Sequence, residues 1–189
     1  MKLIILDRDG VINVDSDEYI KHPDEWQPIP GSLEAIAALN HANYHVVVAS
    51  NQSGIARGLF DIDTLNTIHQ KMYDQLEQVG GHIDALFFCP HTPSDGCNCR
   101  KPKPGMLLEI GERLGCDLRD VYVIGDSLRD LQSAEAVGAK AILLRTGKGA
   151  VTEQLHAFNS KLPVFDNLEV AISSLIRLPD ELDLSDDTA

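Results

Sequence analysis

The stretch KLIILDRDG at residues 2–10 decides the fold, because its aliphatic run ends abruptly on two acidic residues. Short aliphatic runs are typical of strands buried in a parallel sheet. Four similar runs follow at residues 44–49, 85–89, 121–124 and 141–144. Segments with helical periodicity alternate with them, near residues 32–43, 63–79, 104–114, 128–137 and 168–177. This alternation predicts an α/β fold with a Rossmann-like parallel sheet and helices on both faces.

Length and composition indicate one globular domain. The chain has 189 residues, 43% of them hydrophobic, and a formal net charge of −13. We expect a single domain over residues 1–178 and an acidic, disordered tail at 179–189. No apolar run approaches the ~20 residues of a membrane span, so we expect neither a signal peptide nor a membrane helix. The prediction is a cytoplasmic monomer without nucleic acid or membrane partners, since its charge opposes binding to polyanions.

Two aspartates follow the first aliphatic run, at the edge of the sheet where ligands of such folds bind. A lone aspartate there would be read as a turn former or a helix cap. Asp7 and Asp9 are different, because carboxylates this close repel each other unless a cation or a shared proton compensates them. The pair therefore predicts a Mg²⁺ site with one carboxylate free to attack and the other free to move protons.

Polar residues also follow the later runs. Ser50 and Asn51 come after the second run, where a helix cap is the simpler alternative. Asp126 comes after the fourth run as a candidate third metal ligand, and Asp130, one helical turn later, could equally cap or orient its neighbours. The cations of residues 100–103 precede a helix, and in so acidic a chain they favour a phosphate clamp over a solvated turn.

Residues 89–99 carry the pattern C-x-H-x5-C-x-C. In a chain expected in the cytoplasm, thiols stay reduced and such a cluster favours metal. Three thiolates and one imidazole fit a closed, tetrahedral structural Zn²⁺ site. The ligands would be Cys89, His91, Cys97 and Cys99. A disulfide between Cys97 and Cys99, or reactive thiols, are the alternatives. Zinc would stiffen the loop and direct Arg100 and Lys101 toward the site.

Taken together and in this order, the motifs resemble those of the haloacid dehalogenase superfamily of phosphotransferases. The resemblance implies that Asp7 is the nucleophile and that Asp9 acts as general acid and then as base. It also implies that Ser50 donates a hydrogen bond to the phosphoryl group and that Lys101 stabilises its charge. Mg²⁺ would be held by Asp7, the backbone carbonyl of Asp9 and Asp126. The segments between motifs are consumed by core elements, so we expect no large cap domain.

Within the superfamily, the stretches DRDGVIN, SNQSGIARG and CNCRKPKPGM resemble those of heptose bisphosphate phosphatases, over about residues 2–147. That family removes the C7 phosphate in ADP-heptose synthesis for lipopolysaccharide. The likeness implies a sugar phosphate pocket lined by Asp15, Tyr19, Ser50, Asn51, Gln52, Ser53, Arg100 and Lys101. Arg57 is our own candidate for the second phosphate. Ser127 and the short His91–Cys97 spacing leave the anomer preference open.

Two other functions remain open at this point. Histidinol phosphate phosphatases share the D-x-D-G start and a similar zinc loop. Residues 52–58 match the heptose family better, and a bisphosphate would gain more from Arg57 and Arg100. The second alternative is a zinc-stabilised binding module whose aspartates only hold metal, and the intact pair Asp7 and Asp9 argues against it.

Overall fold

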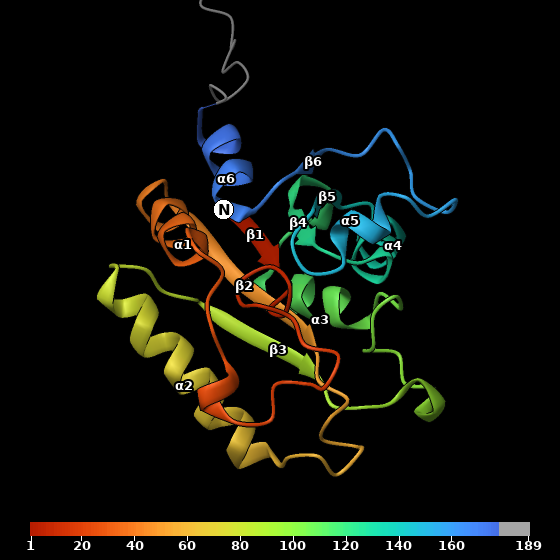
Figure 1. Ribbon diagram of the computed structural model, residues 1–189. Helices are drawn as coiled ribbons and strands as arrows, with labels where there is room; N and C mark the ends of the chain where they lie inside the picture. Colours follow the sequence, from red (N-terminus) through yellow and green to blue (C-terminus); the bar gives the residue numbers. More distant parts are fainter. Residues whose placement is uncertain (178–189) are drawn as a thin grey trace, which may run out of the picture.

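The computed structural model describes residues 1–177, and a six-stranded parallel sheet organises them (Figure 1). Its strand order is β3-β2-β1-β4-β5-β6. The strands are β1 Lys2–Leu6, β2 Tyr44–Asn51, β3 Ala85–Cys89, β4 Tyr122–Gly125, β5 Lys140–Leu144 and β6 Val164–Phe165. The predicted tail at 179–189 lies outside the described residues, and the predicted domain limits stay a prediction.

Helices cover both faces of the sheet. They are α1 Ser32–His41, α2 Ile62–Gln78, α3 Gly105–Leu114, α4 Leu128–Ala136, α5 Gly149–Thr152 and α6 Leu168–Arg177. Three short 3-10 helices, η1 Pro23–Glu25, η2 Pro93–Asp95 and η3 Leu118–Asp120, lie in connections. Helices α1, α2 and α6 share one hydrophobic core, and α3 and α4 share the other. Over residues 1–177, no helix has the length and apolar character needed to cross a bilayer.

The predicted α/β class is confirmed, with differences at element ends. The short elements α5 and β6 were not predicted, because four and two residues are too few to show a periodicity. Strand β2 was predicted to stop at residue 49 but continues to Asn51. Ser50 and Asn51 pair in register with Phe88 and Cys89 of β3, so they lie inside the strand rather than after it. Backbone pairing with a neighbour extends a strand beyond its aliphatic run.

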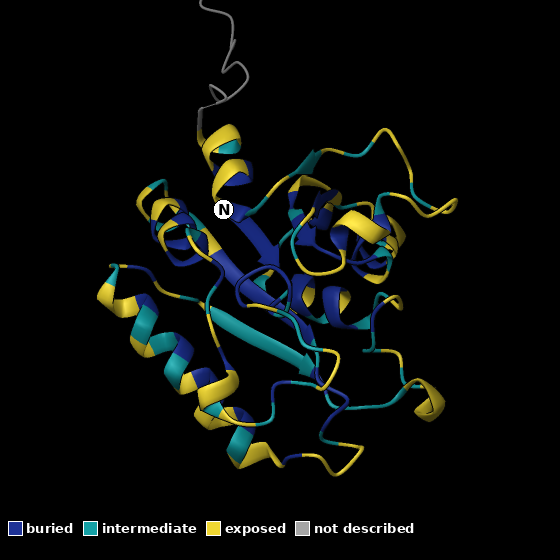
Figure 2. Cartoon of the chain, in the orientation of Figure 1, coloured by how far each residue is buried: buried dark blue, intermediate teal, exposed yellow. Residues whose placement is uncertain are grey.

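Strand β1 contributes to both hydrophobic cores, because successive side chains of a strand point to opposite faces. Ile4 and Leu6 pack in the core with α1 and α2, and Leu3 and Ile5 pack in the core with α3 and α4. The central strands are buried, whereas the edge strand β3 is mostly half-buried (Figure 2). The end of β1 is therefore held rigidly from both sides.

The strand order places the ends of β1 and β4 together at the switch point of the sheet. The chain passes outward from β1 to β2 and β3, and then returns to pair β4 with the other side of β1. Ligands of open α/β folds bind where the connections diverge in this way. The amide of Asp7 donates to the carbonyl oxygen of Ile124 at 2.9 Å, so Asp7 and Asp126 leave neighbouring strand ends.

The segment that follows β1 is anchored before it reaches α1. Trp26 is fully buried in the core with α1 and α2. From α2, Lys71 Nζ donates to the carbonyl oxygens of Pro23 and Trp26 at 2.7 and 2.9 Å. These contacts hold a stretch that has little regular structure of its own.

We expect Trp26→Ala to lower the free energy of unfolding by about 3–5 kcal/mol, because it leaves a large cavity in this core. Urea unfolding measures the change. Val14→Ala is the matched control in the same segment, since Val14 is 50% exposed and its loss should cost under about 0.5 kcal/mol. A loss below about 1 kcal/mol for Trp26→Ala would mean that the segment is not anchored by this side chain.

Candidate active site

A polar cleft opens at the carboxyl edge of the sheet and collects side chains from motifs far apart in sequence. All the predicted catalytic, substrate-binding and magnesium residues line it except Arg57. Its lining residues are Asp7, Asp9, Asp15, Ser16, Asp17, Tyr19, Ile20, Ser50, Asn51, Gln52, Ser53, Arg100, Lys101, Asp126, Ser127, Arg129, Asp130 and Lys148. Arg57 is exposed, with its guanidinium carbon 6.0 Å from the centre of the Tyr19 ring.

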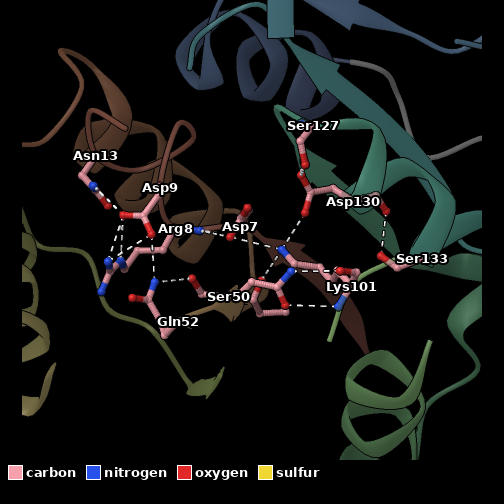
Figure 3. A network of polar contacts seen from close by, with 12 residues as sticks. Asp7, Arg8, Asp9, Asn13, Ser50, Gln52, Lys101, Ser127, Asp130 and Ser133 are labelled. Atoms are coloured by element: carbon pink, nitrogen blue, oxygen red, sulfur yellow. Dashed lines mark hydrogen bonds and ion pairs between the residues drawn. The ribbon is translucent and has the colours of Figure 1, made fainter. Parts of the chain in front are cut away.

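Lys101 is a buried cation between two carboxylates (Figure 3). Its Nζ lies 3.1 Å from Asp7 Oδ1 and 2.6 Å from Asp130 Oδ1, and it donates to the carbonyl oxygen of Ala49 at 2.7 Å. Burial alone would lower the pKa of Lys101, but Asp130 and Asp7 outweigh it and raise the pKa above its usual value. The lysine is therefore charged and held in one position at the floor of the cleft.

Three carboxylates surround this region with too much negative charge for one lysine. Asp7, Asp126 and Asp130 each offer an oxygen within 4.8 Å of the others. Burial raises the pKa of Asp7 well above its usual value, against the effect of Lys101, and Asp130 and Asp126 raise it further. Burial and repulsion from Asp130 raise the pKa of Asp126 to about 7. A divalent cation with a preference for oxygen ligands would relieve this repulsion, so the residues fit Mg²⁺.

The three carboxylates differ in their hydrogen-bond and ion-pair partners. Asp130 caps α4 by accepting from the amide and hydroxyl of Ser127, and it also pairs with Lys101. Asp126 accepts from the amide of Lys148 at 2.8 Å, close to Gly147, whose lack of a side chain makes room for the carboxylate. Asp7 and Asp126 are thus the carboxylates with oxygens left for a metal ion. The sequence left the role of Asp130 open.

Asp9 sits in a separate hydrogen-bond network that keeps it ionised. Its Oδ1 accepts from Arg8 Nε at 3.1 Å, Arg8 Nη2 at 2.9 Å and Asn13 Nδ2 at 2.9 Å. Its Oδ2 accepts from Arg8 Nη2 at 3.0 Å and Gln52 Nε2 at 2.8 Å. Burial opposes ionisation, but the Arg8 charge and these donors outweigh it and hold the pKa of Asp9 below its usual value.

The predicted polar residues at the end of β2 and just after it serve mainly to position others. Gln52 Nε2 bridges Asp9 and Ser50 Oγ, each at 2.8 Å. The Asn51 amide exchanges two hydrogen bonds with the backbone of Lys101, at 3.0 and 3.1 Å. That exchange fixes the basic loop against the strand, and it explains how Lys101 reaches the cleft.

Sequence reasoning missed Arg8, Arg129 and Lys148. Arg8 is completely buried, and charged residues are almost never so unless paired, so its place between two aspartates was the available signal. Arg129 is exposed at the cleft and has no ion-pair partner among residues 1–177. Lys148 Nζ pairs with Asp17 at 2.9 Å and contacts Asp15 at 3.6 Å, which ties the loop after β1 to the start of α5.

The four predicted zinc ligands converge on one point. The Sγ–Sγ distances are 3.6 Å for Cys89–Cys97, 3.2 Å for Cys89–Cys99 and 3.6 Å for Cys97–Cys99. His91 Nδ1 lies 3.6 and 3.4 Å from the sulfurs of Cys89 and Cys99. A tetrahedron built on ordinary Zn–S and Zn–N bond lengths has edges of about 3.6–3.8 Å. The donor set therefore fits zinc, and the cysteines are free rather than bonded as a disulfide.

This cluster is coupled to the cleft through its neighbours. Arg100 Nη1 donates to the carbonyl oxygen of His91 at 3.1 Å, and Lys103 Nζ donates to that of Gly96 at 2.8 Å. The loop that would hold zinc thus directs the basic residues that follow it.

Comparisons with known proteins agree with this architecture. A family model described as HAD-hydrolase-like matches residues 98–171. A protein from Bordetella bronchiseptica named D-glycero-beta-D-manno-heptose-1,7-bisphosphate 7-phosphatase is 59% identical over 80% of this chain and 85% of its own length. A protein of the same name from Pseudomonas aeruginosa is 49% identical over 93% of this chain and 98% of its own. A crystal structure of D,D-heptose 1,7-bisphosphate phosphatase from B. bronchiseptica, complexed with magnesium and phosphate, matches with TM-score 0.91 and 53% identity over 93% of this chain and 98% of that one.

The parallel sheet, the acidic cleft and the family match define a hydrolase of the haloacid dehalogenase class. Within that class, the chain belongs to the family of D-glycero-beta-D-manno-heptose-1,7-bisphosphate 7-phosphatases. The resemblance inferred from the motifs is thereby confirmed.

We expect the purified protein to contain about one zinc per chain and Cys99→Ser to lose it, because a closed site needs all four ligands. The variant should also lower Tm by about 5–10 °C, as expected when a loop of this kind loses its cross-link. Metal analysis and a thermal melt measure both effects. Cys116→Ser, at a half-buried cysteine outside the cluster, is the control. Equal zinc in wild type and Cys99→Ser would contradict the assignment.

Proposed function

We propose that this protein is a Mg²⁺-dependent phosphatase that removes the C7 phosphate of D-glycero-beta-D-manno-heptose 1,7-bisphosphate. The observation that carries the proposal is the buried Lys101 beside Asp7, with Asp126 at the neighbouring strand end, in a chain 49–59% identical to proteins of that name. Its product would serve ADP-heptose synthesis for the lipopolysaccharide core.

Asp7 is the proposed nucleophile. A carboxylate oxygen of Asp7 forms a bond to phosphorus while the bond from phosphorus to the C7 oxygen breaks, and the electron pair of that bond goes to the C7 oxygen. Lys101, 3.1 Å from Asp7, and the Ser50 hydroxyl at the cleft floor offer donors for the oxygens of the phosphoryl group. The leaving oxygen takes a proton from Asp9, whose carboxyl also faces the cleft.

The second step releases phosphate from Asp7. Asp9 accepts a proton from water, the water oxygen bonds to phosphorus, and the bond from phosphorus to Asp7 breaks with its electron pair returning to the carboxylate. Arg8, Asn13 and Gln52 hold Asp9 ionised, which is the form that a base requires. To act as an acid in the first step, Asp9 must first gain a proton as substrate binds.

Asp7, Asp126 and the backbone carbonyl of Asp9 are the proposed ligands of Mg²⁺, which when bound would neutralise charge on the phosphoryl oxygens. Cys89, His91, Cys97 and Cys99 are the proposed ligands of a structural Zn²⁺. The distances among the four zinc ligands support the zinc site, and the spacing of the Asp7 and Asp126 oxygens, within 4.8 Å of each other, supports the magnesium site.

Cations at the cleft mouth support a bisphosphate as substrate. Arg100, Arg129 and Lys148 line the cleft around the floor occupied by Asp7 and Lys101. A heptose bisphosphate carries a second phosphate at its far end, whereas histidinol phosphate carries no second phosphate and instead has a protonated amino group and an imidazole ring. Cations attract the first and repel the second, so the histidinol phosphate alternative is not favoured. The names of the relatives support the beta anomer.

The proposal extends to a cytoplasmic monomer without nucleic acid or membrane partners. Four free cysteines fit a reducing compartment. The net charge of −13 supports a small substrate rather than a polyanion. Light scattering on a size-exclusion column tests the monomer, and a dimer at micromolar concentration would contradict it.

Phosphate release with Mg²⁺ should favour the heptose bisphosphate over histidinol phosphate by about 10²-fold or more in kcat/KM, equivalent to about 2.7 kcal/mol of transition-state binding. Both esters are assayed side by side with the same enzyme. The reverse preference would assign the protein to histidinol phosphate and leave the nucleophile unchanged.

We expect Asp7→Asn to lower kcat by about 10³-fold or more, because the amide cannot attack phosphorus. Asp63→Asn makes the same chemical change at an exposed position of α2 and should leave kcat within about 2-fold of wild type. Thermal melts confirm that both variants fold. A folded Asp7→Asn enzyme with more than about a tenth of wild-type kcat would exclude the nucleophile role.

Arg129 and Arg57 are the two candidates for binding the second phosphate of the substrate, and the KM values of their variants distinguish them. Since Arg129 lines the cleft and Arg57 does not, Arg129→Ala should raise KM for the bisphosphate about 5- to 10-fold and leave KM for heptose 7-phosphate unchanged. Arg113→Ala, at an exposed arginine of α3, is the control. The hypothesis that Arg57 binds this phosphate is wrong if Arg57→Ala leaves KM for the bisphosphate unchanged.

A further inference from the structure

We propose that His69 is a positioning residue, which holds Arg8 so that the Arg8 guanidinium fixes the carboxylate of Asp9 for proton transfer. The inference rests on the proposed function, in which Asp9 serves both chemical steps. It gives a role to a buried histidine of α2 that lies outside every motif of the site.

Arg8 and His69 form a buried contact behind the cleft. Arg8 is completely buried and His69 is 5% exposed. Arg8 Nη1 lies 3.2 Å from His69 Nε2, and the two residues are 61 positions apart in the chain. Neither residue is among those that line the cleft, and the Arg8 guanidinium contacts the cleft lining at Asp9, so the influence of these two side chains on the reaction passes through Asp9.

The guanidinium is a flat group with two edges, and each edge has its own partner. Nε and Nη2 face Asp9 with three hydrogen bonds of 2.9–3.1 Å. Nη1, on the other edge, faces His69. A planar group held at both edges cannot rotate without losing a hydrogen bond, and a buried donor left without a partner is costly. His69 therefore fixes the plane in which Arg8 meets Asp9.

The chemistry of the contact determines the state of the imidazole. Arginine has only donors, so the ring nitrogen that faces it must carry a lone pair. His69 is then neutral, with its proton on Nδ1. Burial and the Arg8 charge lower the pKa of His69 to about 3, which agrees with a neutral ring. The ring of Phe88, 6.4 Å away and tilted by 58°, packs beside it. A neutral acceptor has no proton to give, so His69 is not a catalytic residue.

Loss of the His69 contact should affect the rate of turnover rather than the binding of substrate. Loosening Arg8 would shift the Asp9 carboxylate, while Arg100 and Arg129 at the mouth of the cleft would keep their places. Misplacement of a reacting group by about 1 Å can cost 10²-fold in rate. We therefore expect the effect in kcat rather than in KM.

The test compares two substitutions of similar size. His69→Phe removes the acceptor, and His69→Gln keeps an oxygen near the position of Nε2. We expect His69→Phe to lower kcat about 10- to 100-fold with KM within 2-fold, and His69→Gln to restore most of the rate. Wild-type kcat in folded His69→Phe, or an equal loss in both variants, would overturn the proposal.

A second measurement needs no activity. Imidazole ¹⁵N spectra of the wild-type protein at pH 7 should show His69 with a protonated Nδ1 and an unprotonated Nε2. A proton on Nε2 would overturn the proposal even if neither variant folds. If the wild type fails to hydrolyse the heptose bisphosphate but shows this tautomer, the proposed function fails and the Arg8–His69 contact stands.

Discussion

The buried ion pairs of Lys101 with Asp7 and Asp130 are the constraint on which the rest of the site depends. Burying charge is costly unless it is paired, and here one lysine must compensate several carboxylates. The remaining negative charge makes the cleft floor a place for a divalent cation. That cation and Lys101 together would then supply the positive charge that a phosphoryl group needs. Lys101 itself is carried by a loop with little hydrophobic core. The amide of Asn51 and the cysteine cluster that begins at Cys89 hold that loop in place.

The fold explains why these groups meet. Strand β1 is packed on both faces and flanked by β2 and β4, so Asp7 leaves a rigid strand end beside Asp126. The carboxylates of Asp7 and Asp9, which follow β1, have opposite electrostatic surroundings. Burial, with repulsion from neighbouring carboxylates, raises the pKa of Asp7, whereas the Arg8 charge and the donors around Asp9 lower the pKa of Asp9. The proposed nucleophile, Asp7, and the proposed base, Asp9, are thus separated by a single residue, Arg8.

Much of this could be predicted from the sequence, because it depends on local patterns. Aliphatic runs located the five longer strands, and acidic or polar residues at their ends located the cleft. The spacing of four thiol and imidazole side chains indicated their cluster. The features that the sequence did not predict depend on contacts between segments far apart in the chain. The Arg8–His69 contact joins residues 61 positions apart, and the pairing of Asp130 with Lys101 required the fold to bring α4 to the basic loop. Ser50 and Asn51 were misplaced by the same cause, since pairing with β3 extends β2.

The proposed reaction requires Asp7 to form a covalent bond to phosphorus. Borohydride reduces an acyl phosphate to an alcohol and leaves a free carboxylate unchanged, so quenching the enzyme during turnover of the bisphosphate with Mg²⁺ marks the attacking residue. Peptide mass spectrometry then reads the modified position. If Asp7 is the nucleophile, reduction occurs at residue 7 alone, and none occurs when substrate is left out. An unmodified Asp7 in enzyme that was turning over when quenched, or reduction at Asp9 or Asp126 instead, would contradict it.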